Sequence, residues 1–457
     1  MSRTTATLAA ALDSPRAFAA IVASGLMLRV LCLVALAQFP LVSDALSYHE
    51  MAVKLLHGDR FDPYFPPGVP GYLAFVFRIF GESQIAARAS MLPFYVALSW
   101  LIHRVVGRLS GRRAASLAVL IFTLYPAHVF NAITPLTQLP TATCLMAIVY
   151  LVLRLCDGGR GALAIPLGFF LAWLSLIRPS NLPFLGAVPV FLLVRTRRLL
   201  VVAGALALAA LMIGGWLYRA HAMTGRFVMI NDANSLNLFI ANNPYTPLYR
   251  TWWFGSHGDE SPGVPEGYRA LSKRIQQSPP EVRDKLYSRV AIEHIRGRPD
   301  LFVVRTLNRL RAYFGFDTNT GSHLRAWARV PTSIALGVVI LDAAFYWLVM
   351  VSALAFLFRG HRSSMRSVDL WFVLGTIVTY AIPYWLTLSH PTYHFPVIPL
   401  FAIFGCAYLA RRLGESPRGV SVPPSPSGRG SSVGWRVAVA VFVWVQIEWI
   451  VVNWSRI

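Results

Sequence analysis

Long apolar runs recur along this chain and leave few folds open to it. Of its 457 residues, 56% are hydrophobic and only 14% are charged, whereas soluble proteins average about 25% charged residues. Runs of about 20 apolar residues can be solvated only by lipid or by one another. The sequence therefore predicts an all-α polytopic membrane protein rather than a set of soluble domains.

About eleven of these runs are candidates for membrane-spanning helices. They cover residues 17–37, 85–106, 114–133, 139–155, 163–177, 182–194, 199–217, 332–358, 370–388, 395–409 and 435–452. The fifth and sixth runs are short and are separated by Arg178-Pro179, so they form either two short helices or a broken pair. Residues 68–80 are apolar but too few to span, which is typical of a re-entrant or interfacial helix.

Basic residues mark every second connection between the runs. They are Arg104, Arg108, Arg112, Arg113, Arg154, Arg160, Arg195, Arg197, Arg198, Arg359, Arg362, Arg366, Arg411, Arg412 and Arg418. Because cytoplasmic loops are enriched in Lys and Arg, the pattern predicts a multi-pass protein of the inner, cytoplasmic membrane with a cytoplasmic N-terminus. Any chemistry is then expected on the periplasmic, extracytoplasmic face.

Three regions follow from this topology. Residues 1–220 form an N-terminal transmembrane module that includes a long first outer loop, residues 39–84. Residues 221–331 form a larger outer segment with amphipathic helices. Residues 332–457 hold the C-terminal spans and a Pro-, Ser- and Gly-rich stretch, residues 416–432, which predicts a disordered cytoplasmic linker.

The formal charge of +22 comes from residues scattered between the apolar runs. This distribution favours membrane lipids and anionic phosphate groups as partners, and no nucleic acid. The four cysteines have no metal-like spacing, so neither a disulfide framework nor a zinc site is expected. The first apolar run lacks a cleavage pattern and is predicted to be a retained span.

The first outer loop predicts an amphipathic helix along the outer membrane surface. Ser43 is a candidate N-cap and Gly58 a candidate C-terminal stop. Asp44 lies in the first turn, where its simplest role is that of a partner to the helix dipole. A turn with the sequence Pro-Pro-Gly-Val-Pro-Gly-Tyr follows at residues 66–72.

Several motifs in this order resemble the GT-C glycosyltransferases, and most closely the ArnT/PMT-like, family 39-like group that uses polyprenyl-phosphate-linked sugars. The resemblance rests on the Asp44 helix, the P-P-G turn, the L-x-R-P junction at Arg178, the N-N-P segment at Asn242 and Asn243, and the H-P-x-Y-H-x-P element after His390. It covers roughly residues 26–413. It implies a GT-C-like transmembrane bundle and a hexosyl- or pentosyltransferase whose donor is a polyprenyl-phosphate sugar.

The resemblance also implies roles for individual residues. Asp44 would be the catalytic base, since a carboxylate can accept the proton of an attacking hydroxyl. The leaving phosphate needs positive charge, for which the candidates are Arg178, His390, His394, Lys54 and Arg88. Arg178 is also explained as an interfacial arginine whose side chain reaches the membrane surface. Residues expected to bind substrate are Tyr48, His49, Glu50, Tyr64, Asn242, Asn243 and Tyr393.

A divalent metal remains a possible cofactor of such an enzyme. Some members of the resembled group hold a metal between two acidic groups, whereas this chain has Gln138 where relatives carry a further acid. Candidate second ligands are Glu50, Asp62, Asp232, Asp259 and Glu260. The sequence contains no D-x-D motif, and no metal-binding residues are assigned.

Two other classes of protein are compatible with the sequence. One is a polymerase or ligase of lipid-linked saccharides, and the other is a flippase or transporter. A transporter is expected to carry charges in the middle of its spans, whereas the predicted spans are almost free of charge at their centres, with Asp342 near an outer end as the main exception, which favours chemistry at the membrane surface. Trp252, Trp253 and Phe254 are either a platform for a sugar or an interfacial belt. The acceptor is a lipid, a glycan or a protein.

Overall fold

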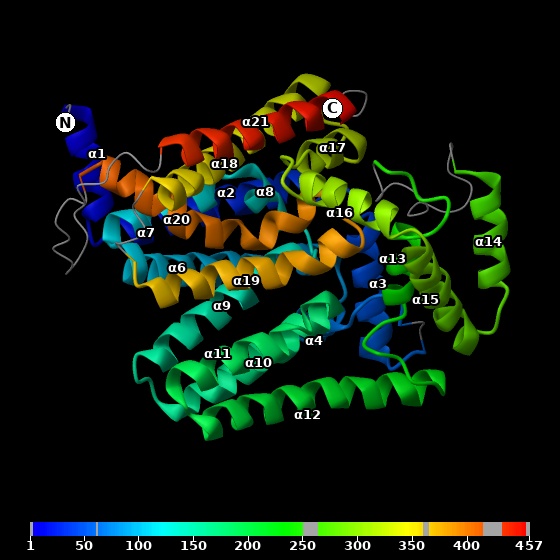
Figure 1. Ribbon diagram of the computed structural model, residues 1–457. Coiled ribbons are helices and arrows are strands. Elements are labelled where there is room, and N and C mark those ends of the chain that lie inside the picture. The colour runs from blue at the N-terminus through cyan, green and yellow to red at the C-terminus, as the bar shows by residue number, and fades with distance from the viewer. Residues whose placement is uncertain (1–2, 61–62, 250–263, 360–364, 415–431, 454–457) are drawn as a thin grey trace.

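The computed structural model describes residues 3–60, 63–249, 264–359, 365–414 and 432–453, and within these ranges it is built from helices and connecting turns without strands (Figure 1). The predicted all-α class is therefore confirmed. The linker at residues 416–432 lies almost wholly outside the described residues, as do Asp62, Trp252, Trp253, Phe254, Asp259 and Glu260.

The helices follow one another in a simple order. They are α1 Arg3–Asp13, α2 Ala17–Leu36, α3 Ser43–His57, α4 Gly68–Phe80, α5 Gln84–Ala89, α6 Leu92–Ser110, α7 Arg112–Leu124, α8 Pro126–Asn131, α9 Gln138–Cys156, α10 Ala164–Ile177, α11 Phe184–Thr196, α12 Leu199–Thr224, α13 Ala233–Ala241, α14 Glu266–Gln276, α15 Pro280–Gly297, α16 Pro299–Tyr313, α17 Asn319–Ala326, α18 Thr332–Phe358, α19 Ser367–Leu386, α20 Ile398–Arg412 and α21 Ser432–Asn453. Three 3-10 turns, η1 Gly161–Leu163, η2 Pro179–Asn181 and η5 Pro391–Val397, interrupt them.

Eight helical stretches of the described chain are long and apolar enough to cross a membrane. Eight of the eleven predicted spans coincide with these stretches, and the other three are shorter helices. The run at residues 114–133 is split into α7 and α8 because Pro126 cannot continue the α7 hydrogen bonds. Helices α10 and α11, of 14 and 13 residues, flank Arg178-Pro179 and are two separate helices. The number of crossings stays a prediction.

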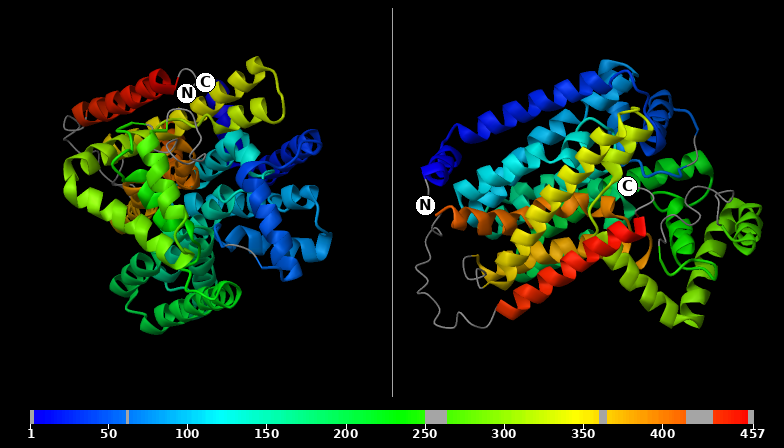
Figure 2. Two further views of the ribbon diagram at one scale, coloured as in Figure 1. Left: turned by 90° about the vertical axis from the view of Figure 1, so that its right-hand side faces the viewer. Right: turned by 90° about the horizontal axis from the view of Figure 1, so that it is seen from above.

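The basic connections gather at one end of the bundle. Arg113 donates to the Leu413 carbonyl at 2.6 Å, Arg198 to the Gly159 carbonyl at 2.5 Å, and Arg366 to Asp157 at 3.3 Å. In Figure 1 this end lies on the left with the N-terminus, whereas α3 and α13 to α17 lie on the right. The view from above in Figure 2 agrees with this separation.

The degree of burial separates central from peripheral helices. In α9 and in the η5–α20 stretch, 83% of the residues of the apolar window are buried, against 17 to 22% in α2, α12 and α21. Figure 2 shows α21 and α12 on the outside of the bundle. The outward apolar faces of these peripheral helices are what a lipid bilayer would cover.

Helix α3 confirms the predicted amphipathic helix and corrects its N-terminal detail. It buries Ala45, Tyr48, Met51 and Ala52 and ends at Gly58, whose φ of 77° is left-handed. The predicted cap at Ser43 is wrong, because Val42 is the N-cap residue and Ser43 is the first helical residue, with a φ of 52°.

One charge in the middle of a span escaped the sequence pattern. Arg29 of α2 is completely buried and donates to the carbonyls of Gly25 at 3.0 Å and Thr123 at 3.1 Å. Its guanidinium lies 3.7 Å from the centre of the Tyr95 ring. The arginine therefore links α2 to α6 and α7 and is explained by packing.

Candidate active site

The junction between α10 and α11 holds Arg178 in an extended conformation. Pro179 disfavours helical geometry at the residue before it, and Arg178 accordingly has a φ of −147° and a ψ of 112°. Helix α10 ends at Ile177, and Arg178 is its extended C-cap residue. The L-x-R-P motif thus serves to present this side chain.

The P-P-G turn packs directly against this junction. A Cβ atom on Gly68 would lie 2.5 Å from the Ile177 nitrogen, so only glycine allows α4 to approach so closely. The Trp173 indole nitrogen donates to the Gly68 carbonyl at 2.9 Å. These contacts join the first outer loop to the end of α10, and they explain why two distant motifs belong to one site.

The Arg178 guanidinium is held by two hydroxyl groups. Its Nε lies 2.9 Å from the Thr137 Oγ1, and its Nη1 donates to the Tyr384 hydroxyl at 3.0 Å. It also lies 5.4 Å from the ring centre of Tyr393. None of these groups carries a negative charge at neutral pH, so the positive charge of Arg178 stays available to an anion.

Asp44 begins the helix that follows the first span, and its carboxylate has no hydrogen-bond or ion-pair partner among the described residues. Burial raises the pKa of Asp44, and the positive charge of Arg178 partly offsets this rise. The preceding residue, Ser43, has the left-handed φ that non-glycine residues adopt at a cost of about 1 kcal/mol. A free carboxylate next to a strained residue is a common feature of functional sites.

Asp44 and Arg178 line the same cavity, which has a volume of about 420 Å³. Its walls come from the α2–α3 connection, the start of α9, α17, η5 and the end of α21. Most of the lining is apolar, including Leu36, Phe130 and Trp449, and a few polar groups converge at Asp44 and Arg178. Such a cavity suits a ligand with a lipid tail and a polar, anionic head.

Arg88 and Gln138 also line the cavity. Arg88 donates to the carbonyls of Phe39 at 3.0 Å and Ile133 at 3.3 Å, so most of its donors fix the first loop. Gln138, in the slot where relatives carry an acid, also lines the cavity. Asp44 is therefore the only carboxylate among the residues that line this cavity.

His390 lines the cavity and is oriented by a buried carboxylate. Its Nδ1 accepts from the Thr392 backbone N–H at 3.2 Å, so a neutral ring carries its proton on Nε2. The Thr392 hydroxyl lies 3.1 Å from both oxygens of Asp317 and donates to this carboxylate. Burial raises the pKa of Asp317 to about 6, and hydrogen bonds from Asn319 and Thr392 partly offset the rise.

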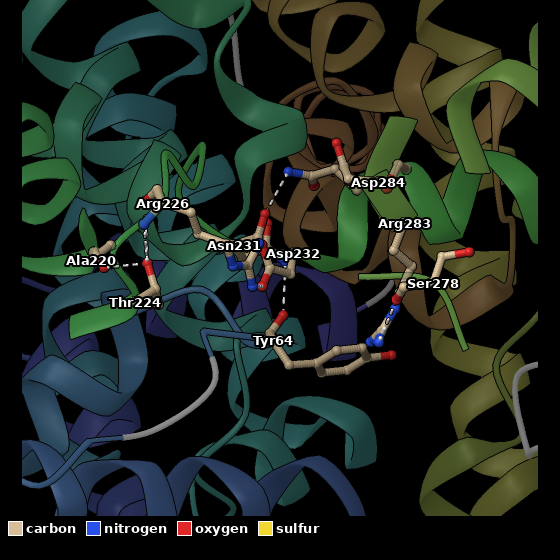
Figure 3. Close-up of polar contacts among 11 residues, drawn as sticks. Tyr64, Ala220, Thr224, Arg226, Asn231, Asp232, Ser278, Arg283 and Asp284 are labelled. Atoms are coloured by element: carbon tan, nitrogen blue, oxygen red, sulfur yellow. Dashed lines mark hydrogen bonds and ion pairs between the residues drawn. The ribbon is translucent and has the colours of Figure 1, made fainter. Parts of the chain in front are cut away.

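The charge of Asp44 acts on three predicted tyrosines. Tyr393 lines the cavity and stacks on Tyr384 with ring centres 4.7 Å apart. Tyr48 is buried on α3, and burial together with the Asp44 charge raises the pKa of Tyr48. The charge of Asp44 also acts on Tyr64, whose carbonyl accepts from Asn231 at 2.9 Å, as Figure 3 shows.

The other candidates do not line this cavity. His394 is buried, and its Nδ1 is bound to the Tyr313 carbonyl at 2.6 Å while its ring stacks on Tyr346. On α3, His49 packs its ring against Phe77, and Glu50 and Lys54 are exposed.

The two asparagines of the N-N-P segment hold the outer segment together. The Asn242 side-chain oxygen accepts from Arg309 at 3.1 Å, and its nitrogen donates to the Leu386 carbonyl at 3.3 Å. Asn243 donates to the Phe239 carbonyl at 2.9 Å and accepts from the Tyr245 backbone at 2.8 Å. Both side chains are completely buried and bonded to protein.

Three residues of the site were not identified from the sequence. Thr137 and Tyr384 bind Arg178 across 41 and 206 residues of the chain, and Asp317 lies 75 residues from Thr392. A need for acceptors near Arg178 follows from its place at the membrane boundary, yet no local pattern identifies which residues supply them. The described residues contain no group of three or more His, Cys, Asp or Glu placed to hold a metal.

Residues 65–217 match a family model described as dolichyl-phosphate-mannose-protein mannosyltransferase. The match runs from the P-P-G turn to α12. It therefore includes Arg178 but begins after Asp44. Over this third of the chain, it confirms the resemblance to GT-C glycosyltransferases that the motifs predicted. No curated protein sequence matches the chain.

Two solved structures of oligosaccharyltransferases from Archaeoglobus fulgidus are similar to the chain. The apo crystal structure has 14% sequence identity and a TM-score of 0.49, with 86% of this chain and 50% of that chain covered. The archaeal oligosaccharyltransferase AglB in complex with an inhibitory peptide and a dolichol-phosphate has 13% identity and a TM-score of 0.47, with 94% and 54% covered. The chain thus spans about half the length of these proteins.

Proposed function

We propose that this chain, which matches the mannosyltransferase family model over residues 65–217, is a membrane glycosyltransferase. It moves a sugar from a polyprenyl-phosphate-linked donor to an acceptor hydroxyl at the Asp44 cavity. The observation that carries the proposal is that an unpartnered carboxylate, Asp44, and an arginine bound only to neutral hydroxyl groups, Arg178, line one largely apolar cavity. Asp44 and Arg178 have the two roles that this reaction needs.

The chemical step assigns one role to each of these groups. The acceptor oxygen forms a bond to the anomeric carbon while the bond from that carbon to the phosphate oxygen breaks. Asp44 takes the acceptor proton, which its raised pKa makes easier to hold. The electron pair leaves with the phosphate, whose negative charge the Arg178 guanidinium stabilises by charge-assisted hydrogen bonds.

Other residues position the substrates in this proposal. His390 lines the cavity beside the phosphate position, and Thr392, which binds Asp317, holds its ring. Tyr393 lines the cavity and offers an aromatic face to the sugar, Tyr48 and Tyr64 lie outside the lining but within reach of the Asp44 charge, and Arg88 holds the first loop in place. Since Asp44 is the one carboxylate of the cavity lining, no step is routed through a metal.

Each of the three regions predicted from the topology contributes residues to the cavity. The module of residues 1–220 supplies Asp44 and Arg178, the outer segment of residues 221–331 adds α17 to the cavity wall, and residues 332–457 add Tyr393 and Trp449. The alternation of basic connections supports an inner-membrane protein with a cytoplasmic N-terminus and a periplasmic cavity. The acceptor is a lipid, glycan or protein hydroxyl at that face.

The test is release of polyprenyl phosphate by the purified chain from a polyprenyl-phosphate sugar, with a membrane extract as the source of acceptor. Asp44→Asn keeps the shape of the side chain but cannot accept the proton, so the rate should fall about 100-fold or more. Asp59→Asn, an exposed carboxylate just after the same helix, is the matched control and should keep the wild-type rate. An unchanged rate in Asp44→Asn would refute the assignment of the base.

The same preparation distinguishes the other classes. A flippase would move the intact lipid-linked sugar between the leaflets of vesicles and release no polyprenyl phosphate. A polymerase or ligase would release the lipid carrier but transfer a saccharide chain. The buried Arg29 does not favour transport, because its donors bind helix carbonyls and link three helices.

A further inference from the structure

A second cavity, of about 670 Å³, lies at the other end of α9 from the Asp44 cavity. Gln138, at the start of α9, lines the Asp44 cavity, whereas Arg154 and Asp157, at its end, line the second one. At 1.5 Å per residue, the 19 residues of α9 separate the two by about 28 Å, close to the thickness of a bilayer core. The second cavity therefore opens at the opposite membrane face.

The charges around this second cavity are strongly unbalanced. Four arginines line it, namely Arg104, Arg108, Arg112 and Arg154, together with the single carboxylate of Asp157. Arg108 already binds this carboxylate with two hydrogen bonds of 2.8 and 2.9 Å. Arg366 donates to the same group at 3.3 Å. The acidic residue is thus neutralised by its own partners, and the remaining arginines face the cavity without a counter-charge from it.

Two of these arginines keep their donors for a ligand. Arg104 and Arg154 are exposed, and neither guanidinium forms a hydrogen bond or an ion pair with another described residue. The Arg104 guanidinium lies 5.8 Å from the ring centre of Trp100, which limits its range of positions. Two guanidinium groups next to one cavity match the geometry of a phosphate, which accepts two parallel hydrogen bonds from each.

An apolar face of α6 leads into the basic cavity. Val96, Trp100 and Arg104 follow one another at intervals of four residues, so they lie on one side of the helix. Val96 and Trp100 are 40% and 42% exposed within a membrane-spanning stretch. The Trp100 ring packs edge-on against Tyr150 of the cavity wall, with ring centres 5.3 Å apart. Apolar surface thus continues into a cationic pocket at the membrane boundary.

We propose that this cavity binds the phosphate headgroup of an anionic phospholipid, whose acyl chain lies along Val96 and Trp100. Arg104 and Arg154 hold the phosphate, and Trp100 and Tyr150 lie at the glycerol level, where aromatic side chains are enriched. Anionic lipids concentrate around clustered arginines at a membrane surface. The bound lipid joins the ends of α6 and α9, and it stabilises the folded chain by mass action.

Thermal unfolding of the purified full chain in detergent micelles tests the site. Addition of dioleoyl-phosphatidylglycerol should raise the unfolding midpoint, whereas zwitterionic dioleoyl-phosphatidylcholine should have little effect. In Arg104→Gln/Arg154→Gln, the concentration of phosphatidylglycerol that gives half the effect should rise about tenfold or more, because charge-assisted hydrogen bonds are lost. Arg197→Gln/Arg412→Gln removes two exposed arginines of the same end that do not line the cavity and should respond like the wild type.

Four results would overturn the proposal. They are an equal response to the two lipids, an unchanged response in the cavity variant, an equal loss in the control variant, and full stabilisation by inorganic phosphate alone, which would assign the site to a soluble phosphate. Arg104→Lys/Arg154→Lys keeps the charge and should retain part of the response, so a loss caused by misfolding is recognisable. Polyprenyl phosphate release is measured separately, so failure of the transferase proposal leaves this test intact.

Discussion

At the scale of single residues, the candidate site depends on two charged side chains, Arg178 and Asp44, neither of which is paired with an opposite charge within the described part of the chain. Arg178 has its donors bound to the neutral hydroxyls of Thr137 and Tyr384. Asp44 has no partner at all among the described residues and is only partly compensated by Arg178. A partly buried arginine near a membrane boundary is costly to keep charged, and Asp44 places an exposed, unpartnered carboxylate in the same cavity, so both are assigned a role in binding and chemistry.

Replacement of Arg178 by lysine should reduce activity although the charge is kept. Lysine cannot hold Thr137 and Tyr384 through a planar fork while it donates to a phosphate, so we expect kcat/KM for polyprenyl phosphate release to fall about tenfold or more. The control is Arg219→Lys, an exposed arginine near the outer end of α12. Equal activity of Arg178→Lys and the wild type would contradict a bidentate role.

The raised pKa of Asp317 predicts that the free energy of unfolding depends on pH. Its pKa rises from 3.8 to about 6 on folding because of burial, so the unfolded chain loses this proton first as the pH rises. The contribution of Asp317 to stability is therefore greatest in acid, declines between pH 4 and pH 6 by roughly 3 kcal/mol, and is constant above that range.

The measurement compares unfolding of the wild type and Asp317→Asn across this pH range. The asparagine does not titrate, so the stability of the wild type relative to the variant should decline from pH 4 to pH 6 and then level off. Asparagine keeps an oxygen that can accept from the Asn319 backbone, whose bond to Asp317 is 2.9 Å long. Parallel curves for the two proteins would rule out a raised pKa at Asp317.

At the scale of secondary-structure elements, a buried polar side chain can accept a hydrogen bond from a free N–H group where a short helix begins inside the bundle. Helix α8 begins within the bundle after the break at Pro126, and a buried helix end needs acceptors for its free N–H groups. Asp342 of α18 accepts from the Ala127 backbone at 2.7 Å. This residue was the main charge that the sequence revealed inside a span, and the structure explains it as a cap from a neighbouring helix.

Removal of this cap should destabilise the bundle without changing the site. Asp342→Ala leaves the Ala127 N–H buried and unpaired, which should cost about 1–3 kcal/mol and lower the thermal midpoint in detergent. Asp342→Asn retains an acceptor oxygen and should lose much less. If the two variants were equally destabilised, the capping explanation would have to be abandoned.

At the scale of the whole molecule, the first loop and the segment after α12 are joined by hydrogen bonds across a long stretch of the chain. The Asn231 side chain donates to the Tyr64 carbonyl at 2.9 Å across 167 residues, and the Asp232 backbone donates to the Pro63 carbonyl at 3.0 Å. Arg226 forms an ion pair with Asp232, and Figure 3 shows these side chains grouped around Tyr64. The outer segment thus holds the loop that carries Asp44.

Loss of this link should loosen the first loop. In Asn231→Ala, hydrogen–deuterium exchange of the Tyr64 and Phe65 amides should become faster, because the anchor of the Tyr64 carbonyl is lost. Activity should fall mainly through a higher KM, since the loop then has to be ordered when substrate binds. Asn234→Ala, an exposed neighbour whose hydrogen bonds are 3.5 Å long, is the control. Unaltered exchange in Asn231→Ala would contradict the proposed link.

The sequence by itself determined the features that depend on local order. Apolar runs of sufficient length predict helices in lipid wherever they stand, and eight of the eleven predicted runs coincide with helices that can cross a membrane. The proline after Arg178 ends α10 by steric contact with its own neighbour. The helix that begins next to Asp44 and stops at Gly58 also follows from local signals.

Tertiary structure decided the partners, because side chains that meet across a bundle have no fixed spacing in the chain. His390 and His394 stand four residues apart in one motif, yet one lines the cavity and the other is buried against Tyr346. Thr137, Tyr384 and Asp317 join the site only because helix packing brings them there. The basic residues predicted a membrane side, but only packing gathered four arginines around one cavity.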